Sequence, residues 1–194
     1  MGCGASSASK ACADQELEAA LARFTTEQVE GSQEKLGLGT NNKEFDTIKS
    51  FTWSFGGTGV VRIGRVQDVT LNKTPKIDLE IEECTGVFRC DNLANGKVVI
   101  KKANILYMHD TCESTVQVDE CNCLIILKDG NKTEYRVGSG RVVAVDHGNI
   151  TLCKGPGVEL LCYQAQSEGL VQGEEAVQEF TSARHQGGAT IRDI

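Results

Sequence analysis

The sequence predicts an all-β fold, a parallel β-helix (solenoid) of about six short coils. Between Val61 and Leu161 a short pattern of alternating aliphatic residues returns six times, with starting positions separated by 18, 19, 18, 19 and 15 residues. The segments between the units, NKTPK, DNLANG, HDTCES, KDGNK and DHG, are rich in turn residues. A period near 18 is too short for helical repeats, so stacked β-coils, spaced by roughly 4.8 Å, are favoured. The starting positions are Val61, Leu79, Val98, Val116, Tyr135 and Ile150.

Each unit is expected to contain two short strands joined by a bend. The first residue of a unit and those two, eight and ten positions later are mostly aliphatic and predict an inward-facing ladder. Arg89 is the one misfit, at the tenth position of its unit. The eighth positions are Val69, Val87, Leu106, Leu124, Val143 and Val158. Residues five positions after each start are mostly small and suit a tight bend.

Two outward-facing rows follow from the same alternation. The first is mainly polar: Arg62, Glu80, Val99, Gln117, Arg136 and Thr151. The second has an apolar centre: Thr70, Phe88, Tyr107, Ile125, Ala144 and Glu159. An apolar surface of that kind is either covered by another segment, here the FTWSF stretch or the C-terminal tail, or contacts a partner. The candidate partner-binding residues are therefore Phe88, Tyr107 and Ile125, with Arg62 and Gln117 on the polar row.

Composition restricts the function classes. The chain has 194 residues, a formal net charge of −7 and a pI near 5.1, which argues against nucleic acid as a partner. No apolar run approaches the roughly 20 residues of a spanning helix, and the sequence has no signal peptide. We therefore expect the nine cysteines to be reduced thiols. Cys112, Cys121 and Cys123 suggest a metal site only weakly, because the three histidines are scattered, and we predict neither a metal nor a cofactor.

The first residues, MGCGASS, predict a membrane anchor. Gly2 with Ser6 fits the N-myristoylation pattern, and Cys3 beside it is a site for palmitoylation. One acyl chain anchors only marginally, and Lys10 is the only basic residue nearby, so the second signal would be an acyl group on Cys3, and Cys12 is a further candidate. Residues 1–13 are interpreted as an acylated leader.

Residues 14–44 are interpreted as a short amphipathic helix followed by a linker. Leu17, Leu21, Phe24 and Val29 recur near one helical face, and Asp14 is a candidate N-cap. Docking of this helix on its own domain is favoured over a membrane or partner. The stretch from Phe45 to Phe55 is expected to be an edge strand or lid that closes the first coil, since an open β-helix end is an unpaired edge.

The coils, LEIEECTGV and VQVDECNCLII above all, resemble the CARP-type β-helix shared by the C-terminal domain of cyclase-associated protein and by tubulin-binding cofactor C domains. The resemblance extends from about Phe45 to the end and implies a β-helix over residues 45–173 followed by a C-terminal hairpin over residues 174–194. The two families imply different activities, so residues outside the repeat decide between them.

The tail GEEAVQEFTSARHQGGATIRDI is similar to the terminal segment of cyclase-associated proteins, although the prolines of that pattern are missing. The resemblance implies a homodimer, formed by a hairpin containing Phe180, Thr190, Ile191 and Ile194, that binds ADP-loaded actin monomers and promotes their nucleotide exchange and recycling. It implies no enzymatic activity. The protein would be cytoplasmic, cytoskeleton-associated and peripheral at the cytoplasmic face of a membrane.

The alternative is a cofactor C-like GTPase-activating or small-GTPase-binding protein acting on an Arf-like GTPase or on tubulin. The Met-Gly-Cys start resembles a membrane-anchored member of that family. Its Q-x-R stretch corresponds to TEYRVGSGR here, which implies Arg136 as an arginine finger, with Glu134 in the place of the glutamine. A structural adaptor at a membrane or cytoskeletal array is the third possibility.

Overall fold

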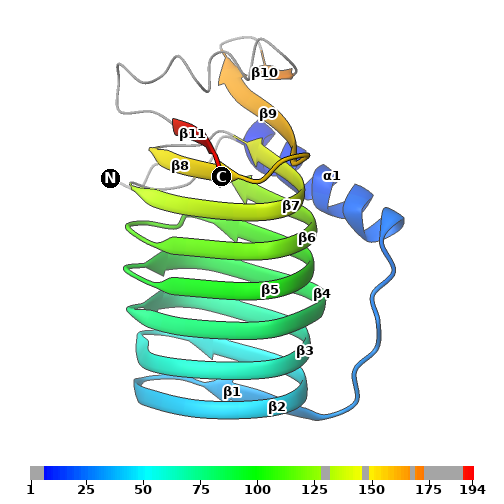
Figure 1. Ribbon diagram of the computed structural model, residues 1–194. Helices are drawn as coiled ribbons and strands as arrows, with labels where there is room; N and C mark the ends of the chain where they lie inside the picture. Colours follow the sequence, from blue (N-terminus) through cyan, green and yellow to red (C-terminus); the bar gives the residue numbers. More distant parts are fainter. Residues whose placement is uncertain (1–6, 128–131, 146–148, 167–168, 173–189) are drawn as a thin grey trace.

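The computed structural model describes residues 7–127, 132–145, 149–166, 169–172 and 190–194. One helix and eleven strands form a parallel β-solenoid of about seven turns (Figure 1). The elements are α1 (Ser7–Arg23), β1 (Ser32–Leu36), β2 (Gly39–Ser54), β3 (Gly57–Pro75), β4 (Ile77–Ala94), β5 (Lys97–His109), β6 (Thr115–Leu127), β7 (Thr133–Val145), β8 (Ile150–Lys154), β9 (Glu159–Gln166), β10 (Gly169–Gln172) and β11 (Thr190–Asp193). The predicted fold class is confirmed.

Each strand from β2 to β7 runs round most of one coil and bends, so the continuous sheet has two faces. The first face contains the first halves of β2–β7 together with β8 and β11. The second face contains β1, the second halves of β2–β7, and β9 with its antiparallel partner β10. Almost all pairing joins one coil to the next in parallel, as a solenoid requires.

The core is a set of aliphatic ladders enclosed between the two faces. On the first face one ladder runs through Val61, Leu79, Val98, Val116, Tyr135 and Leu152. All six side chains are buried. Each buried aliphatic contributes roughly 1.5–3 kcal/mol, so the repeated ladders stabilise a domain that is only one coil wide.

Residue insertions in the bends correct the predicted inward ladder of the second face. In β4 four positions separate Cys84 from Phe88, whereas three separate Val66 from Val69, so Phe88 takes the inward place predicted for Val87. Phe88 is fully buried, and the misfit Arg89 lies on the outer surface. Gly86 occupies the bulge, where a Cβ would lie 2.7 Å from the carbonyl oxygen of Gln67. The inserted residue accounts for the period of 19 in this coil.

The bend of β7 is one residue shorter than that of β6. Cys121 pairs with Gly140, and Leu124 pairs with Val142, so Val142 and not Val143 faces the core. Gly140 has φ of 120°, and a Cβ there would lie 1.7 Å from the carbonyl oxygen of Cys121, so only glycine fits this bend. Val143 and Val145 therefore point outward, while Ala144, predicted to be outward, lies in the core.

The predicted register of the last coil is wrong by two residues. Tyr135 pairs with Leu152, and Ile150 pairs with Thr133. The outward residue next to Arg136 is consequently Cys153 rather than Thr151.

The solenoid begins earlier than the sequence predicted. The stretch interpreted as a linker contains β1 and the start of β2. The stretch from Phe45 to Phe55 is part of the first full coil rather than a lid. Phe51 and Trp53 point into the core, whereas Phe55 is exposed. Only β1 continues the sheet below β2 in the described chain, and it pairs with the second half of that strand.

The predicted helix forms, but seven residues earlier than expected. It spans Ser7–Arg23, so Asp14 is an interior residue and not the N-cap, and Val29 lies beyond the helix. The helix lies against the second face over the upper coils (Figure 1), so the expected docking on its own domain is confirmed. From its end, an extended segment descends along the solenoid to β1 (Figure 1). No helix in the described part of the chain has the length and apolarity needed to cross a bilayer.

Candidate functional site

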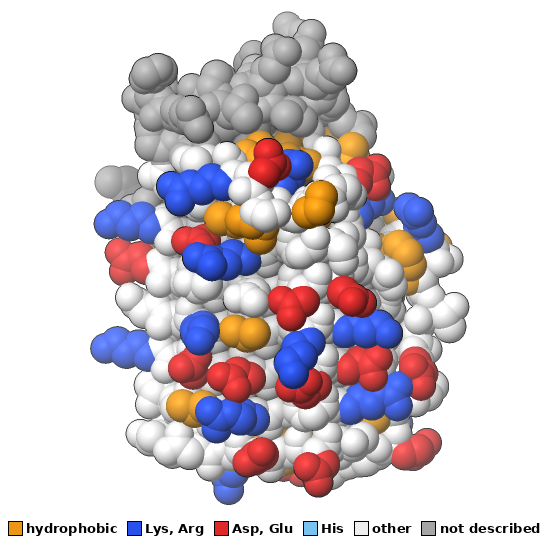
Figure 2. Space-filling view, in the orientation of Figure 1, with side chains coloured by type: hydrophobic (Ala, Val, Ile, Leu, Met, Phe, Trp, Pro, Cys, Tyr) orange, Lys and Arg blue, Asp and Glu red, His pale blue; other side chains and the backbone are white. Residues whose placement is uncertain are grey.

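The outer surface of the first face is the candidate site, because in the described structure it carries charged side chains in register over many coils without a covering element. One row, stacked coil upon coil, is Glu44, Arg62, Glu80, Val99, Gln117 and Arg136. A neighbouring row contains Arg65, Glu83, Lys102 and Glu120. Figure 2, which shows this side of the molecule, has acidic and basic side chains interspersed over the lower and middle coils. We call this surface the polar face.

Opposite charges in adjacent coils form ion pairs across the polar face. The Arg62 Nε donates to Glu80 over 3.0 Å, and both side chains are about half exposed. Lys101 lies 2.6 Å from Glu82. Cross-strand pairs of this kind favour the observed register, although each contributes little to stability when exposed to solvent.

The three sequence-predicted residues of the polar row lie in one line. Arg62, Gln117 and Arg136 are separated only by Glu80 and Val99. Gln117 donates to Asp119 over 3.1 Å, and the Arg136 Nε donates to Glu134 on the same strand. That hydrogen bond, with the negative charge of Glu134, raises the pKa of Arg136. The guanidinium is thus exposed but already paired with a carboxylate.

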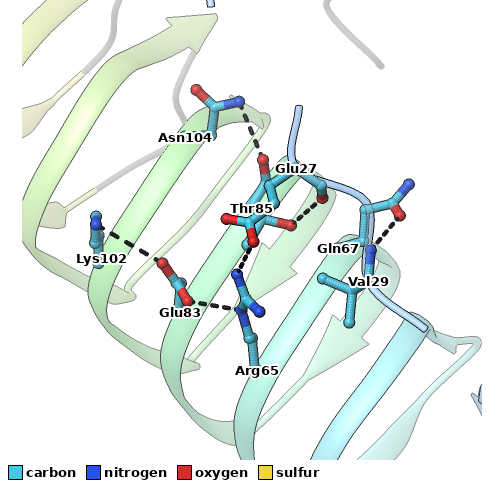
Figure 3. A network of polar contacts seen from close by, with 8 residues as sticks. All are labelled: Glu27, Val29, Arg65, Gln67, Glu83, Thr85, Lys102 and Asn104. Carbon is cyan, nitrogen blue, oxygen red and sulfur yellow. Dashed lines mark hydrogen bonds and ion pairs between the residues drawn. The ribbon is translucent and has the colours of Figure 1, made fainter. Parts of the chain in front are cut away.

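A polar network ties the segment after the helix to one edge of the polar face (Figure 3). We call residues 25–29 the strap. Arg65 lies 2.6 Å from Glu27 of the strap and 2.8 Å from Glu83, and these contacts, with the hydrogen bond to Glu27 first, raise its pKa. The Thr85 hydroxyl donates to the Glu27 carbonyl over 2.7 Å, and the Gln67 side chain accepts from the Val29 amide over 3.1 Å.

The bend next to the strap carries a short ladder of amides. The Asn122 side chain donates to the Asn104 side chain over 2.9 Å, and Asn104 donates to the carbonyl oxygens of Thr85 and Thr25. Together with Lys102, these residues line a shallow depression of about 140 Å³. Drug-sized ligands usually occupy roughly 300–1,000 Å³, so this depression suits a single side chain or a few waters.

A second depression, of about 160 Å³, lies on the polar face over Gly64. Four carboxylates and Arg62 surround it: Glu44, Asp46, Glu80 and Glu82. Within the described ranges, no three acidic, histidine or cysteine side chains are arranged to hold a metal ion.

The apolar residues proposed for partner contact lie elsewhere. Phe88 is in the core, which corrects its predicted place on the outer surface. Tyr107 and Ile125 do point outward, but α1 covers them and both are buried. Of the two alternatives left open by the sequence, cover or partner contact, the structure shows cover, and α1 provides it rather than the FTWSF stretch or the tail. The sequence does contain a pattern that indicates a cover: the outward series Tyr107, Ile125, Val143 and Leu161 is apolar throughout. The predicted register placed Ala144 and Glu159 in this series instead of Val143 and Leu161.

Two buried thiols of the bends, Cys84 and Cys121, are unsuited to nucleophilic chemistry. Burial raises the pKa values of Cys84 and Cys121 to about 12, so these thiols stay protonated near neutral pH. The eight described cysteines are thiols rather than disulfides, as expected from the sequence: Cys12, Cys84, Cys90, Cys112, Cys121, Cys123, Cys153 and Cys162.

The two ends of the chain are only partly described. Gly2, Cys3 and Phe180 lie outside the described residues. A terminal strand is present as predicted, and Thr190 and Ile191 in β11 pair in parallel with Thr151 and Leu152 of β8 in the same chain. Ile191 packs against the core, whereas Ile194 is exposed.

Comparison of the chain with protein-family models, with curated proteins and with solved structures finds no match.

Proposed function

We propose that this protein is a membrane-tethered actin-monomer-binding protein that promotes nucleotide exchange and recycling of ADP-actin. The observation that carries the proposal is the polar face, a broad surface of matched charges on a rigid solenoid. A surface without a deep pocket is suited to another protein rather than to a small substrate. The resemblance of the coils and of the terminal segment to cyclase-associated proteins favours actin as that partner.

Binding and nucleotide exchange on actin monomers test the proposal directly. The protein should bind ADP-actin more tightly than ATP-actin and accelerate release of a fluorescent nucleotide. A charge reversal on the polar face, Arg62→Glu, should weaken binding at least tenfold, because it places a like charge beside Glu80 and inverts the charge that this position presents to the partner. Lys10→Glu on α1 is the matched control and should leave binding unchanged. Failure of the wild-type protein to bind ADP-actin would reject the proposal.

Dimerisation by the C-terminal segment is part of the same proposal. Size-exclusion chromatography should give a dimer for the full chain and a monomer after removal of residues 174–194. Because β11 pairs with β8 and Ile191 packs on the core, circular dichroism must first show that the shortened chain still folds. A monomer in both forms would count against the actin-type function.

Membrane attachment through Gly2 and Cys3 is tested in cells. Gly2→Ala should abolish myristoylation and membrane association, and Cys3→Ser should leave a weaker, reversible association, because one acyl chain anchors only marginally. Wild-type protein found entirely in the soluble fraction would exclude this attachment.

A cofactor C-like action on an Arf-like GTPase or tubulin is the second candidate, and the exposure of Arg136 on the polar face supports it. The hydrogen bond to Glu134 counts against it, because the guanidinium would have to leave a carboxylate to reach a γ-phosphate. Stimulated GTP hydrolysis that is lost in Arg136→Ala but kept in Arg62→Ala would establish this function in place of the first.

A further inference from the structure

The contact between α1 and the second face contains few apolar side chains from the helix. Ala13, Leu17 and Ala20 are its buried apolar residues, spaced so that they share one side of the helix. Cys12 and Phe24 add partial contacts. Leu17 is the only large apolar side chain that α1 buries, so the apolar attraction holding it is small beside that of the solenoid core.

Polar groups around the apolar contact fix the orientation of α1 on the second face. The Tyr163 hydroxyl donates to Glu16 over 2.6 Å, and the Tyr107 hydroxyl donates to Asp14 over 3.2 Å. Arg141 lies 3.6 Å from Glu16, too far for a direct hydrogen bond. The Asp14 side chain is partly exposed, whereas Tyr107 is buried and the Arg141 and Glu16 side chains are only 21% and 14% exposed. These contacts therefore orient α1 and also add to the cost of undocking it.

The strap is anchored independently of the helix. Val29 is 4% exposed, and the strap makes hydrogen bonds or ion pairs with Gln67, Arg65 and Thr85 (Figure 3). The helix ends at Arg23, directly before the strap. Loss of the helix contacts therefore leaves the strap in place, and the short connection between them can act as a hinge.

Removal of α1 would uncover an apolar surface on an otherwise polar solenoid. Its members, which we call the covered patch, are Ile105, Tyr107, Cys123, Ile125, Leu127, Val143 and Val145. Arg89, whose guanidinium lies 5.2 Å from the Tyr107 ring, and Arg141 lie beside it. An apolar patch with arginines and phenol hydroxyls at its rim complements a helix that has small apolar residues on one side and carboxylates next to them.

We infer that the covered patch is a binding surface for an acidic amphipathic helix and that α1 is its displaceable resident. In the closed state α1 blocks the patch. Opening moves the helix about the hinge before the strap while the solenoid stays folded, and a helix of the same chemistry from a partner then takes its place. Because α1 remains tethered, it competes at a high effective concentration, so it acts as an autoinhibitory segment.

Hydrogen exchange of the full-length protein tests whether α1 opens on its own. Backbone amides of α1 should exchange at least tenfold faster than those of β5 and β6. Leu17→Ala should accelerate exchange in α1 at least tenfold more, with no change in β5 and β6. The control is Leu21→Ala, because Leu21 is 46% exposed on the same helix and the substitution is otherwise identical. Exchange of α1 at the rate of the core strands in all three proteins would overturn the inference, as would an α1 without protection in the wild type.

Binding in trans tests the second half of the inference. A fluorescein-labelled peptide of residues 7–24 is titrated against the full-length wild type and against full-length Leu17→Glu, in which the resident helix is weakened. The peptide should bind the variant at least tenfold more tightly than the wild type. A peptide with Asp14 and Glu16 replaced by lysine should bind at least fivefold more weakly. Equal affinity of the wild type and the variant for the peptide would overturn the proposed competition.

Discussion

The two faces of the solenoid are built from the same coils but meet their surroundings in opposite ways. On the first face the outward row is mainly polar, with opposite charges paired between coils, and no helix or strand of the described chain covers it. On the second face the outward row changes character partway up. It begins with Thr52, Thr70 and Arg89 and continues with Tyr107, Ile125, Val143 and Leu161. The helix α1 begins its cover where that change occurs.

This difference separates residues that specify the fold from residues available for function. A parallel solenoid needs its inward ladders, and the outward residues are free to vary as long as apolar ones are covered. The polar face can therefore be altered without damage to the core, whereas an outward residue on the upper second face also determines whether α1 stays docked.

The largest effect on stability is expected at Phe88, which the sequence pattern had placed on the outer surface. Phe88→Ala should lower the free energy of unfolding by about 3–5 kcal/mol, because it leaves a cavity among fully buried side chains. The neighbouring residue Arg89 lies on the outer surface. Arg89→Ala should lower the free energy of unfolding by less than about 1 kcal/mol, the size of one cation–π contact. Urea denaturation measures both. Equal losses for the two variants would mean that β4 has no bulge at Gly86 and that Phe88 does not face the core.

The repeat in the sequence was sufficient to predict the solenoid and, as far as Tyr135 and Arg136, the inward ladder and the outward row of the first face. It failed at the bends, where one residue more at Gly86 or one fewer after Gly140 exchanges inside and outside for the rest of a strand. Alternation alone does not reveal such changes, because valine and phenylalanine suit either a core or a covered outer surface. Arg89 was the visible signal, since a charged residue at an inward position required a shift of one.

The start of α1 could not be predicted from apolar periodicity. Its contact uses Ala13 and Ala20, which are too small to give a strong amphipathic pattern, and Leu21, which fits the pattern, is exposed. The length of the helix follows from the length of the covered patch on the second face rather than from the apolar pattern of the helix itself. The candidate site on the polar face was recovered because the first face kept its register from Arg62 to Arg136.

Matched substitutions in β6 compare the two faces within a single coil. Ile125, beneath α1, is fully buried, and Ile125→Ala should cost about 1.5–3 kcal/mol. Gln117 lies on the polar face of the same strand, and Gln117→Ala should change the free energy of unfolding by less than about 0.5 kcal/mol. Thermal or urea unfolding checks both values. A cost for Ile125→Ala as small as that for Gln117→Ala would show that α1 does not cover the patch in solution.

Alkaline pH should weaken the docking of α1 on the second face. Burial, followed by the nearby Asp14 carboxylate, raises the pKa of Tyr107 to about 12, and burial with the Glu16 hydrogen bond raises that of Tyr163 still more. Because these pKa values lie above the ordinary value near 10, docking has its full stability below pH 10 and loses it as the pH rises through the folded-state values. Carbon-13 NMR of the ring ζ-carbons should follow this titration. In Leu17→Glu both pKa values should fall toward 10, and unchanged values there would contradict the link to α1.

The turns that join the second face of one coil to the first face of the next contain left-handed residues. Lys76 has φ of 54° and Asn95 has φ of 53° at equivalent places in successive coils. A left-handed residue other than glycine costs about 1–2 kcal/mol, while the added freedom of glycine in the unfolded chain costs about 0.4–1 kcal/mol. Lys76→Gly should therefore stabilise the protein by about 0.5–1 kcal/mol. Asn95→Gly should be close to neutral, because asparagine already tolerates this conformation, and thermal unfolding of both variants makes the comparison.

The smallest effect is expected on the polar face itself. Arg62 and Glu80 are about half exposed, so Arg62→Gln should lower the free energy of unfolding by less than about 0.5 kcal/mol at low salt and by still less at high salt. Urea denaturation at two salt concentrations measures this. A larger, salt-dependent loss would mean that the charge rows hold the coils together. With the small value, a loss of partner binding on changing Arg62 can be assigned to the surface and not to the fold, which is the condition for testing function on this face.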